Sequence, residues 1–203
     1  MTRRIVVAIT GATGAVFGIR MLERLAEFDV ERHLIISKWG AKTIEHETGY
    51  SVAEVRALAD VAHGHSEQSA VVSSGSFATE GMVVAPCSMK TLASIASGLA
   101  DDLVGRAADV VLKERRTLVL MVREAPLSAI HLENMLKLAR LGVCIMPPVP
   151  AFYNAPESVE DVVDHLVTRT LDQFGLHSEA TVRWDGRLVR AGGRVVVEGR
   201  MPA

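Results

Sequence analysis

Cysteine is scarce in this chain, with only Cys87 and Cys144 in 203 residues. The spacing of the two does not match that of metal ligands, so we expect no bound metal. Free cysteine is among the most buried residue types, and ordinary packing in the interior is the simplest expectation for both. This cysteine usage fits a reducing, cytoplasmic location.

Long apolar runs are also missing. The N-terminal run Ile5–Ile9 is only five residues long, which is too short for a signal peptide. No other stretch approaches the roughly 18 residues of a membrane-spanning helix. We therefore expect no membrane partner.

The chain has no excess of one charge and few aromatic side chains. Its net charge is −2, and aromatic residues make up 4%. Both values argue against broad binding to nucleic acid or to an anionic membrane, and base-stacking platforms are scarce. Apolar residues, by contrast, reach 49%. A chain of this length fits one domain and can bury about 70% of its unfolded surface.

The hydrophobic pattern alternates between strand and helix. Continuous β-branched runs predict buried strands, and apolar residues three and four apart predict helices. We expect strands at Arg3–Thr10, Arg32–Ser37, Gly81–Ala85, Thr117–Arg123 and Val143–Met146, and helices at Val16–Glu27, Ala41–Glu47, Ser51–Asp60, Met89–Ser97, Asp102–Arg115, Ser128–Leu141 and Ser158–Phe174. This rhythm predicts an α/β fold: a single-domain, Rossmann-like, doubly wound and mostly parallel sheet.

The C-terminal segment reads as an appendage. Arg187–Arg190 and Arg194–Glu198 flank Gly192 and Gly193, a pattern that fits a hairpin and fits a mobile tail equally well. We expect one domain over residues 1–185 and an extension, possibly flexible, over residues 186–203.

Small or hydroxylated residues follow three of the predicted strands, in the segments Gly11–Gly14, Ser37 and Pro86–Thr91. Ligands of open α/β sheets bind outside the carboxyl ends of the strands. Glycines there let the backbone approach a phosphate, and helix N-termini supply N–H donors. One glycine turn alone is as consistent with a tight connection between strand and helix as with a ligand site. Three such segments together favour a ligand that carries a phosphate.

Several cations and one tyrosine are further candidates. Arg106, Lys113 and Arg169 are individually most simply solvated surface charges. Arg123 directly follows an apolar strand, where its guanidinium could grip a phosphate or carboxylate in bidentate fashion. Tyr153 ends a proline-rich loop, which suits positioning over a site. Packing of Tyr153 beneath the loop is an equally good interpretation.

These segments together resemble the UbiX flavin prenyltransferase family over about residues 3–185. The runs that carry the resemblance are TGATG (Thr10–Gly14), Ser37–Lys38, SSGSF (Ser73–Phe77), PCSMKT (Pro86–Thr91), RAADVVLKERR (Arg106–Arg116), LVLMVREAP (Leu118–Pro126), IHLENM (Ile130–Met135), MPPVPAFY (Met146–Tyr153) and RW (Arg183–Trp184). Ser37–Trp39 and Thr43–Glu45 resemble the subfamily associated with hydroxyarylic acid decarboxylases.

The resemblance implies transfer of a dimethylallyl group from dimethylallyl phosphate to N5 and C6 of reduced FMN, giving prenylated FMN for a UbiD-type decarboxylase. It implies a homo-oligomer, a dodecamer, with sites completed by neighbouring subunits. It implies FMN contacts at Gly11, Ala12, Thr13, Ser37, Ser88, Met89, Lys90, Thr91 and Arg123; dimethylallyl phosphate contacts at Ser74, Gly75, Arg106, Lys113, Tyr153, Arg169 and Trp184; and catalytic roles for Glu47, Lys113, Glu124 and Tyr153. No acid lies ~20 residues after TGATG as a dinucleotide site would require, which agrees with FMN.

Two other functions deserve comparison. A flavin-dependent cysteine decarboxylase would carry a PxMNxxMW-like loop where this chain has Pro147–Tyr153, so that function is disfavoured. A non-catalytic, flavin-carrying accessory subunit of a hydroxyarylic acid decarboxylase is the main alternative. The leaving-group residues implied by the resemblance favour an enzyme, because a carrier has no use for them. Asp101–Asp102 is an isolated pair, more simply a helix N-cap than a metal-binding motif.

Overall fold

The computed structural model describes residues 2–178, 188–190 and 193–197, the last two stretches by their backbone alone. The chain forms two compact units, Met1–Pro148 and Val149–Ala203. This division lies before the expected boundary at residue 185, which stays a prediction. Among the described residues, no helix is both long enough and apolar enough to cross a membrane.

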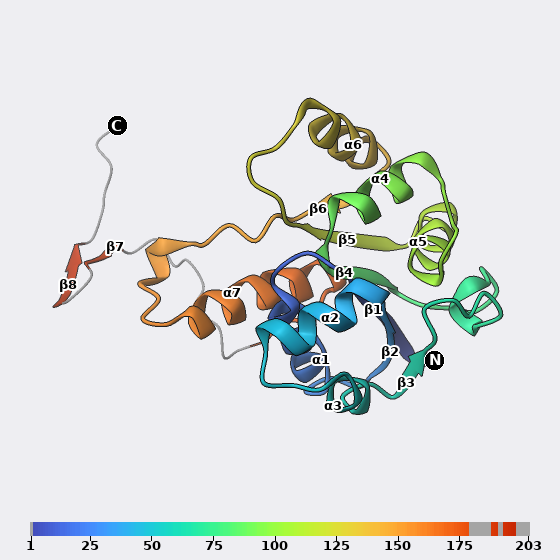
Figure 1. The fold of residues 1–203 in the computed structure, drawn as a ribbon. Helices are drawn as coiled ribbons and strands as arrows, with labels where there is room; N and C mark the ends of the chain where they lie inside the picture. Colours follow the sequence, from blue (N-terminus) through green and yellow to red (C-terminus); the bar gives the residue numbers. More distant parts are fainter. Residues whose placement is uncertain (1, 179–187, 191–192, 198–203) are drawn as a thin grey trace. The chain divides into compact units, whose positions relative to one another are not determined.

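The first unit is built on a parallel sheet of six strands in the order β3-β2-β1-β4-β5-β6 (Figure 1). The strands are β1 (Arg3–Ile9), β2 (Val30–Ile36), β3 (Val61–His63), β4 (Gly81–Cys87), β5 (Thr117–Val122) and β6 (Cys144–Ile145). The strand order reverses between β1 and β4, the switch point at which such sheets bind ligands. The predicted doubly wound α/β fold is confirmed, with the edge strand β3 as an addition.

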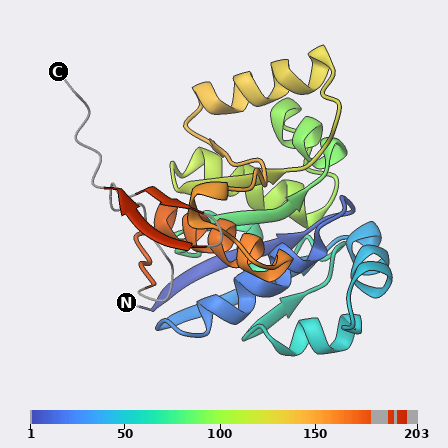
Figure 2. The same ribbon diagram turned by 90° about the vertical axis from the view of Figure 1, so that its left-hand side faces the viewer.

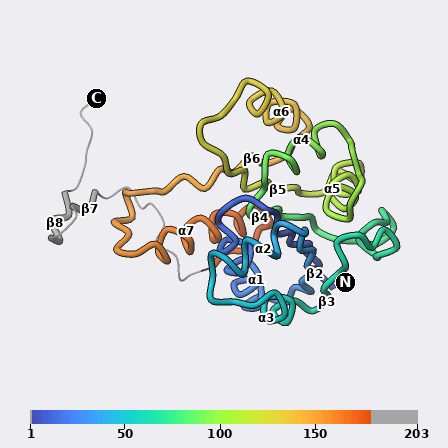
Figure 3. Tube along the Cα trace, in the orientation of Figure 1, coloured from blue at the N-terminus to red at the C-terminus, as the bar shows by residue number. Residues whose placement is uncertain are grey.

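Helices cover both faces of this sheet. They are α1 (Ala15–Leu25), α2 (Lys38–Glu47), α3 (Val52–Ala57), α4 (Met89–Ser97), α5 (Leu103–Lys113) and α6 (Ala129–Arg140), together with the short 3-10 helix η1 (Val71–Ser73). Figure 2 shows α1, in blue, on one side of the sheet, and α4, α5 and α6, green to yellow, on the other. The path of the chain between these layers can be followed in Figure 3.

Local capping sets several helix boundaries. Ser37 Oγ accepts a hydrogen bond from the Gly40 amide at 3.0 Å, so α2 begins at Lys38 rather than at the predicted Ala41. Ser51 begins α3 with a capping box, as its sequence predicts. Asp102 is the N-cap of α5, which confirms the simpler interpretation of the Asp101–Asp102 pair.

Both faces of the central strands are buried, which explains their continuous apolar runs. Val6 and Ala8 of β1 belong to a core cluster with Leu92 of α4 and Val104 of α5. The alternate residues of β1 point to the opposite face, and Val7 among them is also fully buried. Cys87 lies inside the same cluster, and burial raises the pKa of its thiol well above the ordinary range. Its predicted packing role is thereby confirmed, and Cys144 is half-buried.

The second unit contains η2 (Phe152–Asn154), α7 (Val159–Leu171), η3 (Asp172–Phe174) and the strands β7 (Leu188–Arg190) and β8 (Gly193–Val197). A capping box between Ser158 and Asp161 begins α7. Strands β7 and β8 pair antiparallel. This pairing fits the hairpin alternative, and the extension over residues 186–203 stays a prediction.

Candidate active site

A cleft of about 680 Å³ opens at the carboxyl edge of the sheet in the first unit. Five of the predicted FMN contacts line it: Gly11 after β1, Ser37 after β2, and Ser88, Lys90 and Thr91 after β4. The sequence therefore predicted correctly that the ends of these strands meet at one place. The cleft lies where the strand order reverses, which is the expected ligand position in this class of sheet.

The N-terminal ends of three helices border this cleft. Ser37 caps α2, Ser88 Oγ accepts from the Thr91 amide at 3.3 Å to cap α4, and Asp102 Oδ1 accepts from the Gly105 amide at 2.8 Å to cap α5. Helix N-termini carry partial positive charge and N–H donors, and Lys90 adds a full charge to the same wall. The donor set therefore fits a phosphate group.

A buried hydroxyl joins two of the ligand-facing turns. Thr10 Oγ1 donates to the carbonyl oxygen of Pro86 at 2.7 Å and accepts from the amide of Ser88 at 2.9 Å. The amide of Arg123 donates to the carbonyl oxygen of Cys87 at 3.1 Å. The ends of β1, β4 and β5 are thus tied together by hydrogen bonds, which fixes the spacing of the turns that form the cleft.

Gly11 allows the close approach of α2 at the rim of the cleft. A Cβ added at Gly11 would collide with the Cβ of Trp39. Trp39 lines the cleft, and its side chain is 74% exposed. The absence of a side chain at Gly11 therefore leaves room for this indole and for a planar ligand beside it.

The other predicted FMN contacts are placed differently. Ala12 is buried, and Thr13 is exposed. Met89 packs against the hydrophobic core, so only its backbone is left for a ligand. Arg123 is exposed beyond the end of β5, and its guanidinium makes no hydrogen bond or ion pair within the described part of the chain.

Glu47, the last residue of α2, is fixed to the first turn. Its Oε2 accepts from the amides of Gly14 at 2.7 Å and Ala15 at 3.2 Å. Partial burial alone would raise the pKa of Glu47, but hydrogen bonds from the Thr13 hydroxyl and these amides outweigh it and hold the pKa below its ordinary value. Glu47 is therefore an ionised carboxylate that positions the turn at the N-terminus of α1.

The predicted phosphate residues Ser74, Gly75, Arg106 and Lys113 gather around α5 and the loop after η1. Arg106 Nε donates to the carbonyl oxygen of Ser73 at 3.1 Å. Lys113 forms an ion pair with Glu114, and a Cβ added at Gly75 would meet both of these side chains. Ser74 and Lys113 are exposed. None of these four predicted residues lines the cleft.

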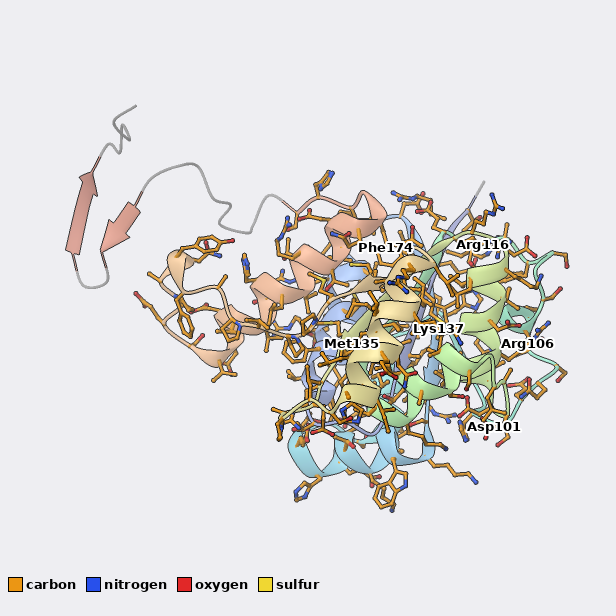
Figure 4. All side chains as sticks on the ribbon, turned by 90° about the horizontal axis from the view of Figure 1, so that it is seen from above. Asp101, Arg106, Arg116, Met135, Lys137 and Phe174 are labelled. Carbon is orange, nitrogen blue, oxygen red and sulfur yellow. The ribbon has the colours of Figure 1, made fainter. Side chains whose placement is uncertain are left out.

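Arg116 is a cation of this region that the sequence analysis did not single out. Its guanidinium donates to the carbonyl oxygens of Gly75 at 2.7 Å and Phe77 at 2.8 Å. It thereby holds the backbone of the loop that carries Ser74. Arg106 near the start of α5 and Arg116 beyond its end are labelled in Figure 4.

The remaining predicted residues lie elsewhere. Glu124 is exposed, and its Oε1 accepts from the Ala125 amide at 3.0 Å. In the second unit, the Tyr153 ring packs edge-to-face on His165 with centroids 6.0 Å apart. Arg169 pairs with Asp172 at 2.7 Å. Trp184 lies outside the described residues.

The sequence analysis did not single out several residues of the cleft, namely His65, Ser66, Ser94 and Gly105, and it gave no site role to Lys38, Trp39, Asp101 or Asp102. Ser94 lies on α4 one helical turn after Lys90, so helical spacing from a predicted ligand residue could have indicated it. His65 and Ser66 follow the unpredicted strand β3, and no periodic pattern marks their loop.

Comparison with known proteins agrees with this geometry. The family model described as Flavoprotein matches residues 1–171. The "Probable UbiX-like flavin prenyltransferase" of Streptomyces sp. (strain D7) is 62% identical over 193 residues, which cover 94% of this chain and 96% of that protein. The chain belongs to the UbiX-like flavin prenyltransferase family. The resemblance read from its motifs is confirmed at this level.

Two crystal structures of this family superpose closely on the chain. The dodecameric FMN-dependent UbiX-like decarboxylase of Escherichia coli O157:H7 has a TM-score of 0.89 at 60% identity, covering 90% of this chain and all of that one. AnUbiX (PadA1), solved with FMN and dimethylallyl pyrophosphate, has a TM-score of 0.91 at 56% identity, covering 92% and 99%. The UbiX fold thus extends over nearly the whole chain.

Proposed function

We propose that this chain transfers the dimethylallyl group of dimethylallyl phosphate to N5 and C6 of reduced FMN and releases inorganic phosphate. The observation that carries the proposal is the cleft at the strand switch point, lined by Ser37, Ser88 and Thr91. It occurs in a chain 56% identical to AnUbiX, which was crystallised with FMN and dimethylallyl pyrophosphate.

The cleft residues would hold FMN. The amides at the start of α2 and α4, with the hydroxyls of Ser37, Ser88 and Thr91, suit its phosphate. The open backbone at Gly11–Thr13 suits the edge of the flavin, and Arg123 offers a charged donor at the end of β5. Reduced FMN, when bound, supplies the nucleophilic N5 and C6 atoms; the protein binds and orients it.

The cations around α5 would stabilise the leaving phosphate. As the allylic carbon–oxygen bond breaks, negative charge grows on the phosphate, and pre-positioned Arg106 and Lys113 would stabilise that charge. Ser74 and Gly75 would add donors, while Tyr153, Arg169 and Trp184 would complete the site. We propose that copies of the chain assemble so that neighbours share these residues, as a dodecamer like the Escherichia coli relative.

Proton transfer accompanies the second bond, which joins a carbon of the prenyl chain to C6. The prenyl double bond gains one proton as this bond forms and C6 then loses one, and the released phosphate, with a second pKa of about 6, can carry the proton. Glu47 and Glu124 are the carboxylates proposed to assist. Glu47 is held at the first turn by the Gly14 and Ala15 amides and is ionised at neutral pH, as a proton acceptor must be, although its lowered pKa makes it a weaker base than an ordinary carboxylate.

We further infer that the product serves a UbiD-type decarboxylase acting on hydroxyarylic acids, in the cytoplasm. The resemblance of Ser37–Trp39 to that subfamily supports the inference, and all three residues line the cleft. The alternative is an accessory subunit that only carries flavin. Phosphate release from dimethylallyl phosphate that requires reduced FMN, and that Lys113→Ala abolishes, would separate the enzyme from the carrier. FMN binding without any phosphate release would favour the carrier.

A further inference from the structure

His65 is a titratable residue of the cleft that the proposed chemistry does not use. It follows β3, and its side chain is 21% exposed. Its Nδ1 is buried and has no hydrogen-bond partner within the described residues. The nearest charged oxygen is Asp102 Oδ2 at 3.9 Å, which is too far for a hydrogen bond but close enough for an electrostatic contact with an imidazolium.

The partners of His65 are held in place. Asp102 Oδ1 is engaged by the Gly105 amide at 2.8 Å, which leaves Oδ2 as the oxygen that faces the imidazole. The carbonyl oxygen of His65 accepts from the Leu103 amide at 3.0 Å. Because both the backbone of His65 and the carboxylate of Asp102 are tied to the start of α5, the ring has a defined position. With Nδ1 turned toward the acid, Nε2 is the nitrogen left for a ligand.

The distribution of charge in the cleft favours a cationic donor at the position of His65. A phosphate monoester carries between one and two negative charges near neutral pH. The walls formed by α2 and α4 suit it, with Lys38 and Lys90, but Asp101 and Asp102 on the α5 side would repel it. The His65 ring lies on that side with Nδ1 facing Asp102 Oδ2 at 3.9 Å, so in its protonated form it would offset the repulsion and place an Nε2–H donor toward the phosphate.

We propose that His65, oriented by Asp102, binds the phosphate of FMN. The inference rests on the proposed function only in taking FMN as the ligand of the cleft. It adds a cationic donor on the α5 side of the cleft to the hydroxyls and amides of α2 and α4. The substrate feature that His65 recognises is therefore the phosphate monoester, and the isoalloxazine ring is not involved.

The test compares FMN with riboflavin, which lacks the phosphate. Dissociation constants of both flavins and of dimethylallyl phosphate are measured by calorimetry for the wild type, His65→Leu, His65→Gln and Asp102→Asn. His177→Ala is the matched control, because His177 also pairs with an aspartate, Asp172, but its side chain is 67% exposed and does not line the cleft. Circular dichroism melts verify that each variant is folded.

We expect His65→Leu to weaken FMN at least about ten-fold, the loss typical of a charge-assisted hydrogen bond, and to leave riboflavin unchanged. His65→Gln keeps a hydrogen-bond donor without the charge, so its affinity for FMN should lie between those of the wild type and His65→Leu. Asp102→Asn keeps the oxygen that caps α5 but loses the charge that orients His65, so it should also weaken FMN binding. His177→Ala should bind FMN as the wild type does.

Three results would overturn the inference. An equal loss of FMN and riboflavin in His65→Leu would assign His65 a structural role. Unchanged FMN binding in a folded His65→Leu would remove it from the site. If His65→Leu binds dimethylallyl phosphate more weakly but FMN normally, His65 contacts the phosphate of dimethylallyl phosphate and not that of FMN. A wild type that binds FMN but transfers no prenyl group would defeat the proposed function alone, so the two failures can be told apart.

Discussion

Thr10 and Ser88 are joined by a part-buried hydrogen bond in which the Ser88 amide donates to Thr10 Oγ1 at 2.9 Å. The same hydroxyl donates to the Pro86 carbonyl oxygen at 2.7 Å. One side chain thus couples the turn after β1 to the turn after β4. The geometry of the proposed phosphate site depends on the relative position of these two turns.

Thr10→Val should therefore lower both stability and FMN affinity. Valine keeps the volume but leaves the part-buried Ser88 amide unpaired, while the Pro86 carbonyl keeps its bond from the Thr10 amide; the loss is about 1–2 kcal/mol in the free energy of unfolding. Urea denaturation measures this loss, and Thr10→Ser, which keeps the hydroxyl, is the control. If Thr10→Val proves as stable as Thr10→Ser, the hydroxyl does not hold the turns together.

Gly11→Ala should lower the affinity for FMN because the new Cβ would collide with Trp39 Cβ. The backbone of the turn or the start of α2 must then shift, and either movement displaces donors of the cleft. Gly49→Ala is the matched control, since a Cβ at Gly49 meets nothing within 4 Å. FMN titration, with quenching of tryptophan fluorescence as the signal, compares the two. Equal affinities would show that the close approach at Gly11 is unimportant for the ligand.

Glu47→Gln should keep FMN bound yet slow formation of the prenylated product, with the reaction halting after the first carbon–nitrogen bond. The glutamine oxygen can still accept from the Gly14 and Ala15 amides, but the negative charge is lost. Single-turnover kinetics measure the effect. Wild-type kinetics in this variant would remove Glu47 from the mechanism.

The same variant makes a prediction about pH. Because the pKa of Glu47 is lowered from its ordinary 4.5 in the folded chain, its charge stabilises the fold above that value and the effect disappears as the pH falls through the lowered pKa. The contribution is about 0.5–1 kcal/mol, as for an exposed acid at a helix N-terminus. Wild type and Glu47→Gln should differ in unfolding free energy at pH 7 and converge in acid; a constant difference would contradict this.

Arg169→Ala should weaken the binding of dimethylallyl phosphate by about ten-fold or more, because a charged donor is lost, and should leave FMN binding unaffected. Tyr153→Phe should act in the same direction but less, since its hydroxyl is neutral. The structure shows Arg169 paired with Asp172, so Asp172→Asn is the control that breaks the pair but keeps the cation. If Arg169→Ala binds the substrate normally, the surface pair is its whole role.

The fold could be read from the sequence because its central strands are buried on both faces. The runs Ile5–Ile9 and Leu118–Val122 are then continuously apolar and differ from the alternating pattern of half-exposed strands. The edge strand β3 escaped notice for the opposite reason. It has only three residues, and Val61 and Ala62 are exposed, so it carries no hydrophobic pattern.

The candidate site could be predicted only where it follows from topology. Gly11, Ser37 and Ser88 each follow a strand, and parallel strands deliver their ends to one edge. His65 belongs to an irregular loop, and its proximity to Asp102 comes from tertiary contacts that spacing cannot reveal. The packing of the Met89 side chain against the core also follows from tertiary contacts, and its proposed contact with FMN stays a prediction.

The most direct test of the proposed function is the identity of the flavin after reaction. The purified protein is incubated without oxygen with reduced FMN and dimethylallyl phosphate, and the extracted flavin is analysed by mass spectrometry. The account predicts FMN that has gained one isoprene unit, with one phosphate released per flavin. Recovery of unmodified FMN from a protein that demonstrably binds both ligands would contradict it.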